Sequence, residues 1–305
     1  MGVNSNSQIP SLSRLAEAMK KDNGKAILQL AHGGRESAYS QNNDYQAIAP
    51  SKMDFPWLDY DVKEMTNDDI NKIIDDFATA TQRAIDAGFD GVEIHNGNHD
   101  LLQQFFSAFS NQRIDKWGGS LSNRMELPLA VLKAIRAVID DNKQADFILG
   151  WRISPEEIHG ENIGYKVDEM LAQAKKAVEI GIDYLNVSLT GLQYNYAAMP
   201  QGYNESFAEL FDKISGEAPV FIGSQIHTVA DGMAALDNAE GVYIAREALI
   251  DPEFTAKVID KKEDEIVTTM TFERLKEIGL SDGLLKTYAT LTDWAKSIPL
   301  KGLKY

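Results

Sequence analysis

Six short apolar segments alternate with helix-forming segments, and this alternation constrains the fold more than any other feature of the chain. Such a sequence folds into βαβ units around a parallel sheet, with right-handed crossovers. The six segments lie near residues 26–30, 91–94, 147–153, 184–189, 220–224 and 241–245. The sequence therefore predicts an α/β fold. Two architectures fit six strand–helix units: an open doubly wound sheet, or a (β/α)8 barrel with two strands unaccounted for.

Local patterns give further expectations. Thr66 followed by Asp69 is typical of a capping box, and apolar residues recur on one face of the following helix as far as Ile85. The first strand, AILQL, is a short apolar run and is expected to be fully buried. Residues 36–65 contain Pro50, Pro56 and no clear period, so we expect a long loop that forms a lid or rim.

Polar side chains at the strand ends favour the barrel. No G-x-G-x-x-G follows any predicted strand, which counts against a dinucleotide-binding sheet. In parallel barrels the active site lies at the carboxyl ends of the strands. The polar residues at these ends are Gln29, His32, Arg35, His95, Asn98, Arg152, Ser224, Gln225 and Arg246. Their spread over most of the strands is what a ring of strands around one site predicts.

Composition excludes several classes of function. The chain has 305 residues, a net charge of −16 and no cysteine. The negative charge argues against nucleic acid and acidic membranes as partners, because both bind basic patches. The lack of cysteine excludes disulfides, thiolate catalysis and cysteine-ligated iron–sulfur or zinc sites. There is neither a secretory signal nor an apolar run near the ~20 residues of a membrane helix, so we expect a cytoplasmic protein.

Residues 88–124 hold the strongest candidate site. A short apolar strand over 91–94 leads into a sharp turn that carries His95 and Asn98. These two hydrogen-bonding side chains come directly after the carboxyl end of a predicted buried strand. Arg152, inside another apolar strand, needs an anion beside it, because an unpaired buried charge is very costly. A ligand and a carboxylate both fit that requirement.

Six motifs of the chain resemble, in order, those of the flavin-dependent old yellow enzymes, ene-reductases also called NADH:flavin oxidoreductases. The motifs are AILQLAHGGR, APS at 49–51, AGFDGVEIHNGNHDLLQQFFS, NQRIDKWGGSLSNR, GWRIS and AREALIDP. They cover roughly residues 9–259. The resemblance implies a TIM-type (β/α)8 barrel that binds FMN. It also implies that NADH or NADPH supplies hydride, which passes to an electron-poor alkene, quinone or nitro compound.

The resemblance implies roles in binding the cofactor. Gln29 would hydrogen-bond the pyrimidine edge of the flavin. Arg152 would lie near the N1–C2 side and favour the anionic reduced form by charge complementarity. Backbone N–H groups together with an arginine suit a phosphate dianion. The residues that would hold the phosphate are Ser224, Gln225, Ala245 and Arg246.

The resemblance also implies an acceptor site. His95 and Asn98 would hydrogen-bond the carbonyl or nitro oxygen of the substrate. Two donors aimed at one oxygen stabilise the negative charge that develops there when hydride reaches the β-carbon. The partner is therefore expected to be a small-molecule acceptor.

Other polar residues are expected to be structural. A loop-bracing network is predicted for Asn111, Arg113, Asp115 and Asn123. No metal site is predicted, because the spacing of His32, His159 and His227 fits no ligand pattern.

Two local departures from the family pattern affect the expected chemistry. The family usually carries a tyrosine, the proton donor, where this chain has Asp100. An aspartate ionised at neutral pH donates a proton only if its pKa is raised. The phosphate loop reads GSQI where many members have two glycines, and Ala245 replaces a further common glycine. Ser224 and Gln225 restrict φ more than glycine does.

The third departure concerns the start of the barrel. Family members begin with about two strand units before the segment that opens this chain, so the expected barrel, 1–259, is N-terminally incomplete. A mostly helical extension is expected over 260–305. Another chain that supplies the strands, or a homo-oligomer, is a possible partner, because an open barrel exposes two sheet edges.

Three functional hypotheses result. The leading one is the FMN-dependent oxidoreductase described above. The alternative is a truncated or degenerate barrel without independent catalysis, which acts as a partner subunit or is inactive. An aldolase or isomerase of the phosphate-binding barrel type ranks last, because no lysine lies at a predicted strand end.

Overall fold

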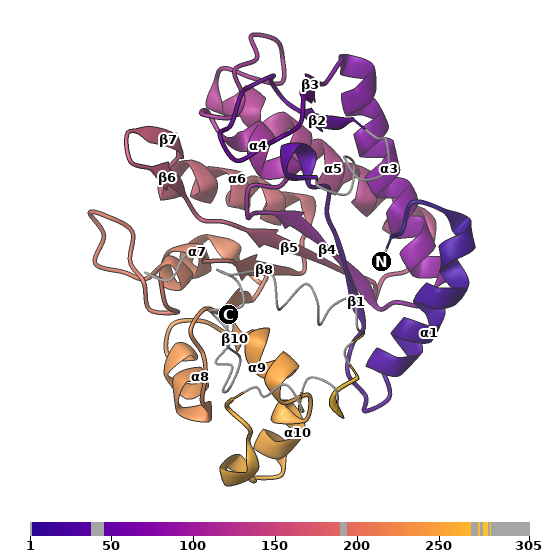
Figure 1. The fold of residues 1–305 in the computed structure, drawn as a ribbon, viewed down its shortest axis with the longest axis vertical. Coiled ribbons are helices and arrows are strands. Elements are labelled where there is room, and N and C mark those ends of the chain that lie inside the picture. The colour runs from indigo at the N-terminus through magenta and orange to yellow at the C-terminus, as the bar shows by residue number, and fades with distance from the viewer. Residues whose placement is uncertain are drawn as a thin grey trace.

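Six parallel strands form one twisted sheet at the centre of the structure (Figure 1). The computed structural model describes residues 2–37, 46–189 and 194–269, together with Arg274, 277–279 and Ser281. Across the sheet the strands are β1 (Ile27–Leu30), β4 (Gly91–Asn96), β5 (Ile148–Ile153), β8 (Tyr184–Val187), β9 (Val220–Ile222) and β10 (Gly241–Val242). All six predicted strands are therefore confirmed.

The strands follow one another across the sheet in chain order. Every neighbouring pair is parallel, and the first register runs from Ile27 opposite Gly91 to Leu30 opposite Ile94. Within the described residues β1 and β10 are the outer strands, each hydrogen-bonded to one neighbour. All carboxyl ends consequently point to the same side of the sheet.

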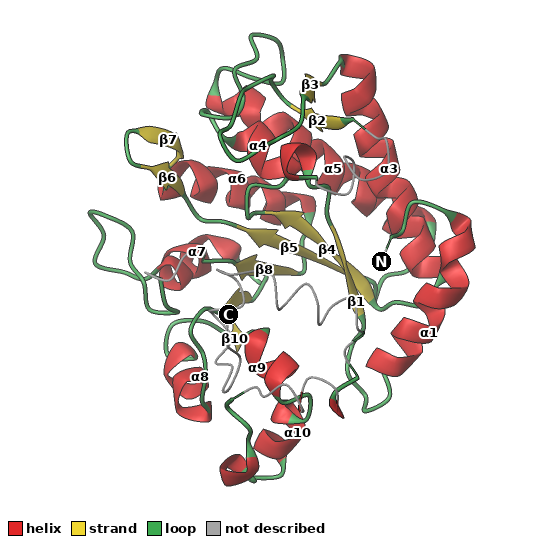
Figure 2. Cartoon of the chain, in the orientation of Figure 1, coloured by secondary structure: helices red, strands yellow, loops and turns green. Residues whose placement is uncertain are grey.

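Helices cover one face of this sheet (Figure 2). Between the sheet strands lie α3 (Asn67–Asp86), α5 (Leu121–Asp141), α6 (Val167–Ile180), α7 (Phe207–Ser215) and α8 (Val229–Ala235). The others are α1 (Ile9–Met19), α4 (Leu101–Phe106), α9 (Arg246–Ile250) and α10 (Phe254–Ile259). Three 3-10 turns are η1 (Asn6–Gln8), η2 (Gly34–Glu36) and η3 (Glu263–Glu265).

Helix α3 confirms the predicted capping box. The Thr66 hydroxyl accepts a hydrogen bond from the Asp69 backbone N–H, and the Asp69 carboxylate accepts one from the Thr66 N–H. These contacts satisfy two of the amide groups that a helix start leaves without partners. The apolar face then packs into the main core through Ile70, Ile73, Phe77, Ala80 and Ala84.

Alternation along the strands separates a helix-facing layer from an inner layer. Val92 and Ile94 of β4 are buried in the same core as Leu149, Trp151 and Ile153 of β5. Side chains of a strand alternate between the two faces of a sheet, so the residues between these lie on the opposite, inner face. The inner residues of the central strands are Glu93, His95, Gly150, Arg152, Tyr184, Asn186 and Ser188. The helices thus bury the apolar half of each strand, and the polar half faces inward.

Four short strands and one edge residue differ from expectation. The stretch predicted as an irregular loop contains β2 (Ala47–Ala49) and β3 (Val62–Glu64), and 155–165 contains the hairpin β6 (Glu157–His159) with β7 (Asn162–Tyr165). These strands lie in stretches without the alternation of strands and helices that identified the six strands of the main sheet. The expectation that the first strand is fully buried is wrong: Gln29 is exposed on the outer strand β1.

The stretch after β4 folds as a braced loop around a buried helix. All six residues of α4 are buried. Asn111 donates to the carbonyl oxygens of Phe105 and Trp117, each at 2.7 Å, and Arg113 donates to those of Pro50 and Met65. Asp115 accepts from Arg113. Asn123 donates to the carbonyl oxygen of Gly118. The predicted loop-bracing network is therefore confirmed.

Parts of two predictions lie outside the described residues. These are 38–45 of the expected lid or rim and most of the expected extension over 260–305. The described residues contain no helix long and apolar enough to cross a membrane.

Replacing Asn111 by alanine is expected to lower the free energy of unfolding by about 3 kcal/mol, because two carbonyl groups lose their buried donor. Urea unfolding followed by circular dichroism measures this. The matched control is Gln112→Ala, which removes a neighbouring exposed amide that also bonds two carbonyls. That change should cost less than about 1 kcal/mol, and equal losses in the two variants would contradict the bracing role.

Candidate functional site

A cavity of about 400 Å³ lies at the carboxyl ends of β8, β9 and β10. Six of the eight residues predicted to form the site line it: Asn98, Arg152, Ser224, Gln225, Ala245 and Arg246. The remaining lining residues are Ser188, Leu189, Ile226, Tyr243, Ile244 and Glu247. The fold thus brings together side chains that are up to 148 positions apart in the chain, from Asn98 to Arg246.

His95 adjoins this cavity through Asn98. The strand continues to Asn96, so His95 sits on the inner face of β4 and not in the turn expected from the sequence. Its Nε2 lies 3.3 Å from Asn98 Nδ2. Asn98 has a left-handed backbone with a φ of 52°, and its N–H donates to Ser154 Oγ at 2.9 Å. This contact fixes the turn that places the Asn98 side chain beside the His95 ring.

Burial keeps the His95 ring neutral. Desolvation, aided by the nearby positive charge of Arg152, lowers the pKa of His95 to about 4. Its Nδ1 is buried and makes no hydrogen bond within the described residues. At neutral pH His95 is therefore an uncharged ring with one N–H to donate.

Asp100 lies beside His95, and its pKa is shifted in the opposite direction. Its Oδ2 is 3.7 Å from His95 Nε2. Burial raises the pKa of Asp100 to about 7, and the charge of Glu36 adds to this shift. Because the pKa of the histidine falls and that of the aspartate rises, the two groups face each other uncharged between about pH 4 and 7 and form no ion pair. Asp100 can consequently hold a proton near neutral pH.

Arg152 points into the cavity from the inner face of β5. It donates to Ser188 Oγ at 2.9 Å, and its guanidinium stacks on the Tyr243 ring at 4.7 Å. Ser188 in turn donates to Asn98 Oδ1. No carboxylate of the described residues lies within 4.0 Å of Arg152. Of the two partners considered from the sequence, an anionic ligand is therefore the better fit.

The opposite end of the cavity carries the segments expected to hold phosphate. Ser224 and Gln225 take left-handed φ values of 87° and 53° without being glycine. Their side chains both donate to the carbonyl oxygen of Tyr194, which anchors the loop in this conformation. Ala245 precedes the five-residue helix α9, and Arg246 is its first residue. Arg246, not a long helix dipole, provides the positive charge here.

Gln29 is placed differently from the other predicted residues. It does not line the cavity, and its Nε2 donates to Glu93 Oε1 at 2.6 Å. The same carboxylate accepts from Tyr184 and Asn186. We did not single out Glu93 or Asn186 from the sequence. The available signal was a charged residue and an amide inside the apolar strands GVEI and YLNV, since buried polar groups need partners.

The sequence of this chain is similar to those of known flavin oxidoreductases. The model of the NADH:flavin oxidoreductase / NADH oxidase family matches residues 1–265. The chain belongs to this family. An uncharacterized oxidoreductase of Streptococcus pyogenes serotype M5 (strain Manfredo) is 34% identical over 304 residues, covering 97% of this chain and 76% of the relative. A probable NADH-dependent flavin oxidoreductase of Bacillus subtilis (strain 168) is 30% identical over 293 residues, covering 96% of this chain and 78% of the relative.

Other relatives are longer than this chain. The NADH:acrylate oxidoreductase of Vibrio harveyi is 35% identical over 85% of this chain but only 26% of its own length. Among solved structures, a 2-naphthoyl-CoA reductase complex superposes with a TM-score of 0.75 and 26% identity, over 88% of this chain and 43% of that one. The old yellow enzyme homologue of Zymomonas mobilis superposes with a TM-score of 0.73 and 23% identity, over 90% of this chain and 77% of that one. At this identity the likeness shows the fold alone.

Family membership confirms the broad predictions. The fold is an α/β sheet of the TIM-barrel type seen in the old yellow enzymes, with six strand–helix units in the described residues. The chain is an NAD(P)H-dependent flavin oxidoreductase of this family, and the predicted cofactors, FMN with NADH or NADPH, are the family's cofactors. The roles of individual residues remain predictions.

A histidine–carboxylate cluster lies beside the site. One ligand atom each from His99, Glu157 and His159 lie within 4.8 Å of one another. Glu157 is buried, and its two oxygens already accept hydrogen bonds from Ser107 and Gln103, each at 2.8 Å. These contacts attach the β6–β7 hairpin to α4 and explain the cluster as a brace. The prediction that the protein has no metal site is not tested by this arrangement.

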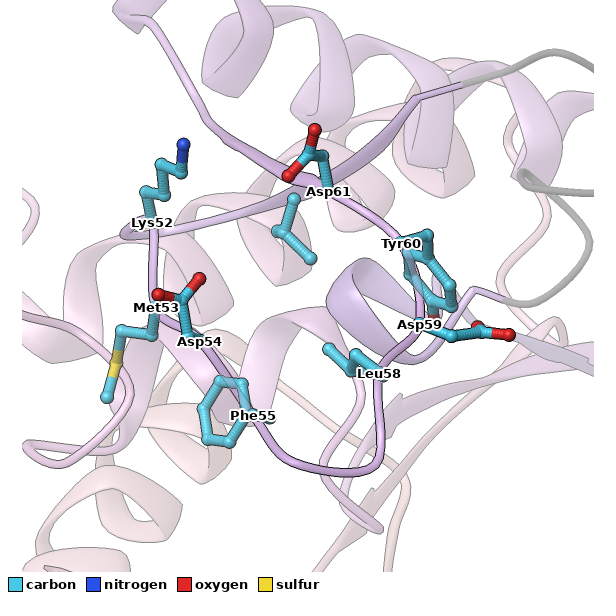
Figure 3. Close-up of a pocket in the computed structure, with 9 residues that line it drawn as sticks. Lys52, Met53, Asp54, Phe55, Leu58, Asp59, Tyr60 and Asp61 are labelled. Atoms are coloured by element: carbon cyan, nitrogen blue, oxygen red, sulfur yellow. The ribbon is translucent and has the colours of Figure 1, made fainter.

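A second cavity, of about 440 Å³, is lined by residues 52–55 and 58–62 (Figure 3). None of the eight predicted site residues lines it. Phe55, one of its lining residues, packs against the Arg35 guanidinium at 4.5 Å. The larger size of this cavity does not make it the chemical site.

His95 and Asp100 are expected to contribute oppositely to the pH dependence of stability. His95 protonates near 6.5 when unfolded but only at about 4 when folded, so its contribution to the free energy of unfolding rises from about pH 4 to 6.5. Asp100 ionises near 3.8 when unfolded but only at about 7 when folded, so its contribution falls as the pH rises through the same range. The two effects oppose each other in the native chain.

Single substitutions separate the contributions of His95 and Asp100 to the pH dependence of stability. Relative to the native chain, Asp100→Asn should gain on the order of 3 kcal/mol of stability between about pH 4 and 6.5, and His95→Gln should lose a similar amount. Urea unfolding across this range measures both slopes. Parallel pH profiles for the three proteins would show that burial does not shift these groups.

Proposed function

We propose that this flavin oxidoreductase takes hydride from NADH or NADPH and passes it to an electron-poor acceptor: an activated alkene, a quinone or a nitro compound. FMN supplies the hydride chemistry when bound. The observation that carries the proposal is the pairing of two neutral hydrogen-bonding side chains, His95 and Asn98, at the edge of a cavity that contains two arginines. Such a cavity suits an anionic cofactor and an acceptor that becomes more negative during reduction.

The donor set of the cavity fits FMN. Two arginines, Arg152 and Arg246, and one carboxylate, Glu247, line it, so the cavity carries more positive than negative side chains in a chain whose net charge is −16. Arg246 and the loop at Ser224 and Gln225 would hold the phosphate, since an arginine and backbone N–H groups suit a dianion. Arg152 would hold the N1–C2 side of the ring system, with Ser188 and the Tyr243 ring fixing its guanidinium. A positive charge there favours the reduced, anionic form.

His95 and Asn98 would bind the oxygen of the acceptor. Ser188 donates to Asn98 Oδ1, which orients the amide so that its NH₂ group lies toward His95 Nε2. An oxygen within hydrogen-bond distance of both nitrogens, to one side of the line that joins them, can accept from both when Nε2 carries the ring proton. Donors placed where negative charge develops are worth several kcal/mol of transition-state stabilisation in a site with little water, by general estimates of about 3–4 kcal/mol per donor.

The first test measures flavin and ligand binding. The purified protein should bind about one FMN per chain, with the visible absorption of a flavin. A phenol, which mimics an acceptor oxyanion, should then produce a long-wavelength charge-transfer band. In His95→Ala/Asn98→Ala, FMN should remain bound, and the phenol dissociation constant should rise at least tenfold because both donors are gone. An unchanged phenol titration would refute the assigned acceptor site.

Asp100 would supply the proton in alkene reduction. It follows Asn98 by two residues, lies 3.7 Å from His95 and makes no capping bond to α4, so its carboxyl group is not committed to the helix. Burial and the charge of Glu36 raise its pKa to about 7, which keeps the proton available at neutral pH. The carboxyl proton would pass to the α-carbon of the alkene as hydride reaches the β-carbon.

Two measurements test this role. Because the acid must be protonated, the rate of reduction of 2-cyclohexenone should fall as the pH rises through about 7. In Asp100→Asn this pH dependence should disappear, and the rate should drop by about 100-fold. Reduction of the bound flavin by NADH, and of a quinone whose oxygens take protons from water, should change little. A proportional loss with alkene and quinone would indicate a general structural defect.

The alternative is a chain that does not catalyse by itself and acts as a partner subunit. The observation that favours it is the open sheet, because β1 and β10 each have one paired neighbour within the described residues and Gln29 is exposed. A preparation that remains colourless after addition of FMN would support this reading. A homo-oligomer, or a second chain that pairs with these edges, would then be sought by light scattering.

A further inference from the structure

Among the described residues that line the cavity at the strand ends, Glu247 is the one carboxylate. It follows Arg246 in α9, and 11% of its side chain is exposed. A carboxylate opposes the binding of a phosphate dianion, because like charges repel most strongly where little water screens them. The placement of the Glu247 side chain therefore bears directly on the affinity of this cavity for an anion.

His227 holds the Glu247 side chain. Its Nδ1 lies 2.6 Å from Glu247 Oε1. An ionised carboxylate only accepts hydrogen bonds, so Nδ1 carries the proton and donates it to this bond. The histidine ring is half-exposed and is not among the described residues that line the cavity. The oxygen that it binds is consequently turned out of the cavity.

The main chain of His227 is fixed as well. Its N–H donates to Asp231 Oδ2 at 3.0 Å. The same oxygen accepts from the N–H and from the hydroxyl of Thr228, each at 2.9 Å, as part of the capping box of α8. The ring is therefore attached to a backbone that the start of α8 holds in place.

The pair also joins the two segments expected to hold phosphate. His227 continues the loop that begins at Ser224, and Glu247 directly follows Arg246. The strands that lead into these segments, β9 and β10, pair over only two residues each. The contact between His227 and Glu247 connects the two segments again beyond this short ladder.

We propose that His227 is a positioning residue: by holding Glu247 out of the cavity, it lets the cavity select a flavin with a phosphate over one without. This inference rests on the proposed binding of FMN and concerns its phosphate end. Without the histidine, the carboxylate would be free to turn toward Arg246, where it would compete with the phosphate for the arginine and repel it. A phosphomonoester carries a charge of about −1.5 to −2 at neutral pH, so this repulsion acts on the phosphate and not on the uncharged ring system.

Riboflavin is the matched ligand, because it has the ring system and the ribityl chain of FMN but no phosphate. Quenching of flavin fluorescence by the flavin-free protein measures both dissociation constants without turnover. In His227→Ala, the affinity for FMN should fall about tenfold, and the affinity for riboflavin should change less than about twofold. Equal weakening of the two flavins would overturn the proposal.

Removal of the carboxylate provides a second comparison, which needs FMN alone. Glu247→Gln should bind FMN at least as tightly as the native chain, because the charge that opposes phosphate is gone. In His227→Ala/Glu247→Gln, the affinity should return to within about twofold of that of Glu247→Gln, since no charge is left to hold. A histidine that only supported the loop would weaken FMN equally with and without the carboxylate, and that result would refute the proposed role.

Three further variants separate the donor from the fold. His227→Asn keeps an N–H donor close to the position of Nδ1 and should retain most of the affinity for FMN. His227→Phe keeps a ring without a donor, and it replaces His227→Ala in both comparisons if the alanine variant does not fold. The structural control is Thr228→Ala, which loses the hydroxyl that caps α8 but keeps the pair. It should lower the urea midpoint of unfolding and leave the preference for FMN over riboflavin unchanged; a loss of preference as large as in His227→Ala would contradict the proposal.

The native chain separates failure of this inference from failure of the proposed function. A native chain that binds neither flavin would refute the proposed binding of FMN. A native chain that binds FMN, with variants at His227 and Glu247 that do not differ as described, would refute only this inference.

Discussion

The buried carboxylate of Glu93 is the interaction on which the inner face of the sheet depends. Removal of such a charge from water costs several kcal/mol, unless hydrogen-bond donors replace the water. Here donors from β1 and β8 do so, and the contact spans the two strands that lie between them. It therefore ties the outer strand β1 to β8 in the middle of the sheet.

The fold was predictable where the sequence shows a regular pattern. Alternating apolar segments and helices identified all six strands of the main sheet, because each is an apolar run that lies between helix-forming segments. The strands β2, β3, β6 and β7 were missed because they lie in stretches without this strand–helix alternation. The burial of Gln29 was misjudged for a different reason. Whether a strand lies at the edge of a sheet depends on pairing partners, which the strand's own residues do not specify.

The site was predictable as a set of residues but not as a chemical environment. Strand-end positions and family motifs selected residues that prove to line one cavity, such as Arg152 and Arg246. Glu93 escaped because it lies in mid-strand, where apolar neighbours suggest a core position. The left-handed backbone of Ser224 and Gln225 also could not be anticipated, because their side-chain bonds to Tyr194, 30 and 31 residues away, maintain it.

Asp100 shows why environment decides function at this position. An aspartate has an ordinary pKa near 4, and a phenol near 10, so at neutral pH only the phenol normally retains its proton. Burial and the charge of Glu36 raise the pKa of Asp100 to about 7, between these two values. An ionised carboxylate beside His95 would oppose negative charge on a bound oxygen, whereas a protonated one adds a donor. The replacement of tyrosine by aspartate is thus compatible with an acid role, but only up to neutral pH, where a phenol would continue into the alkaline range.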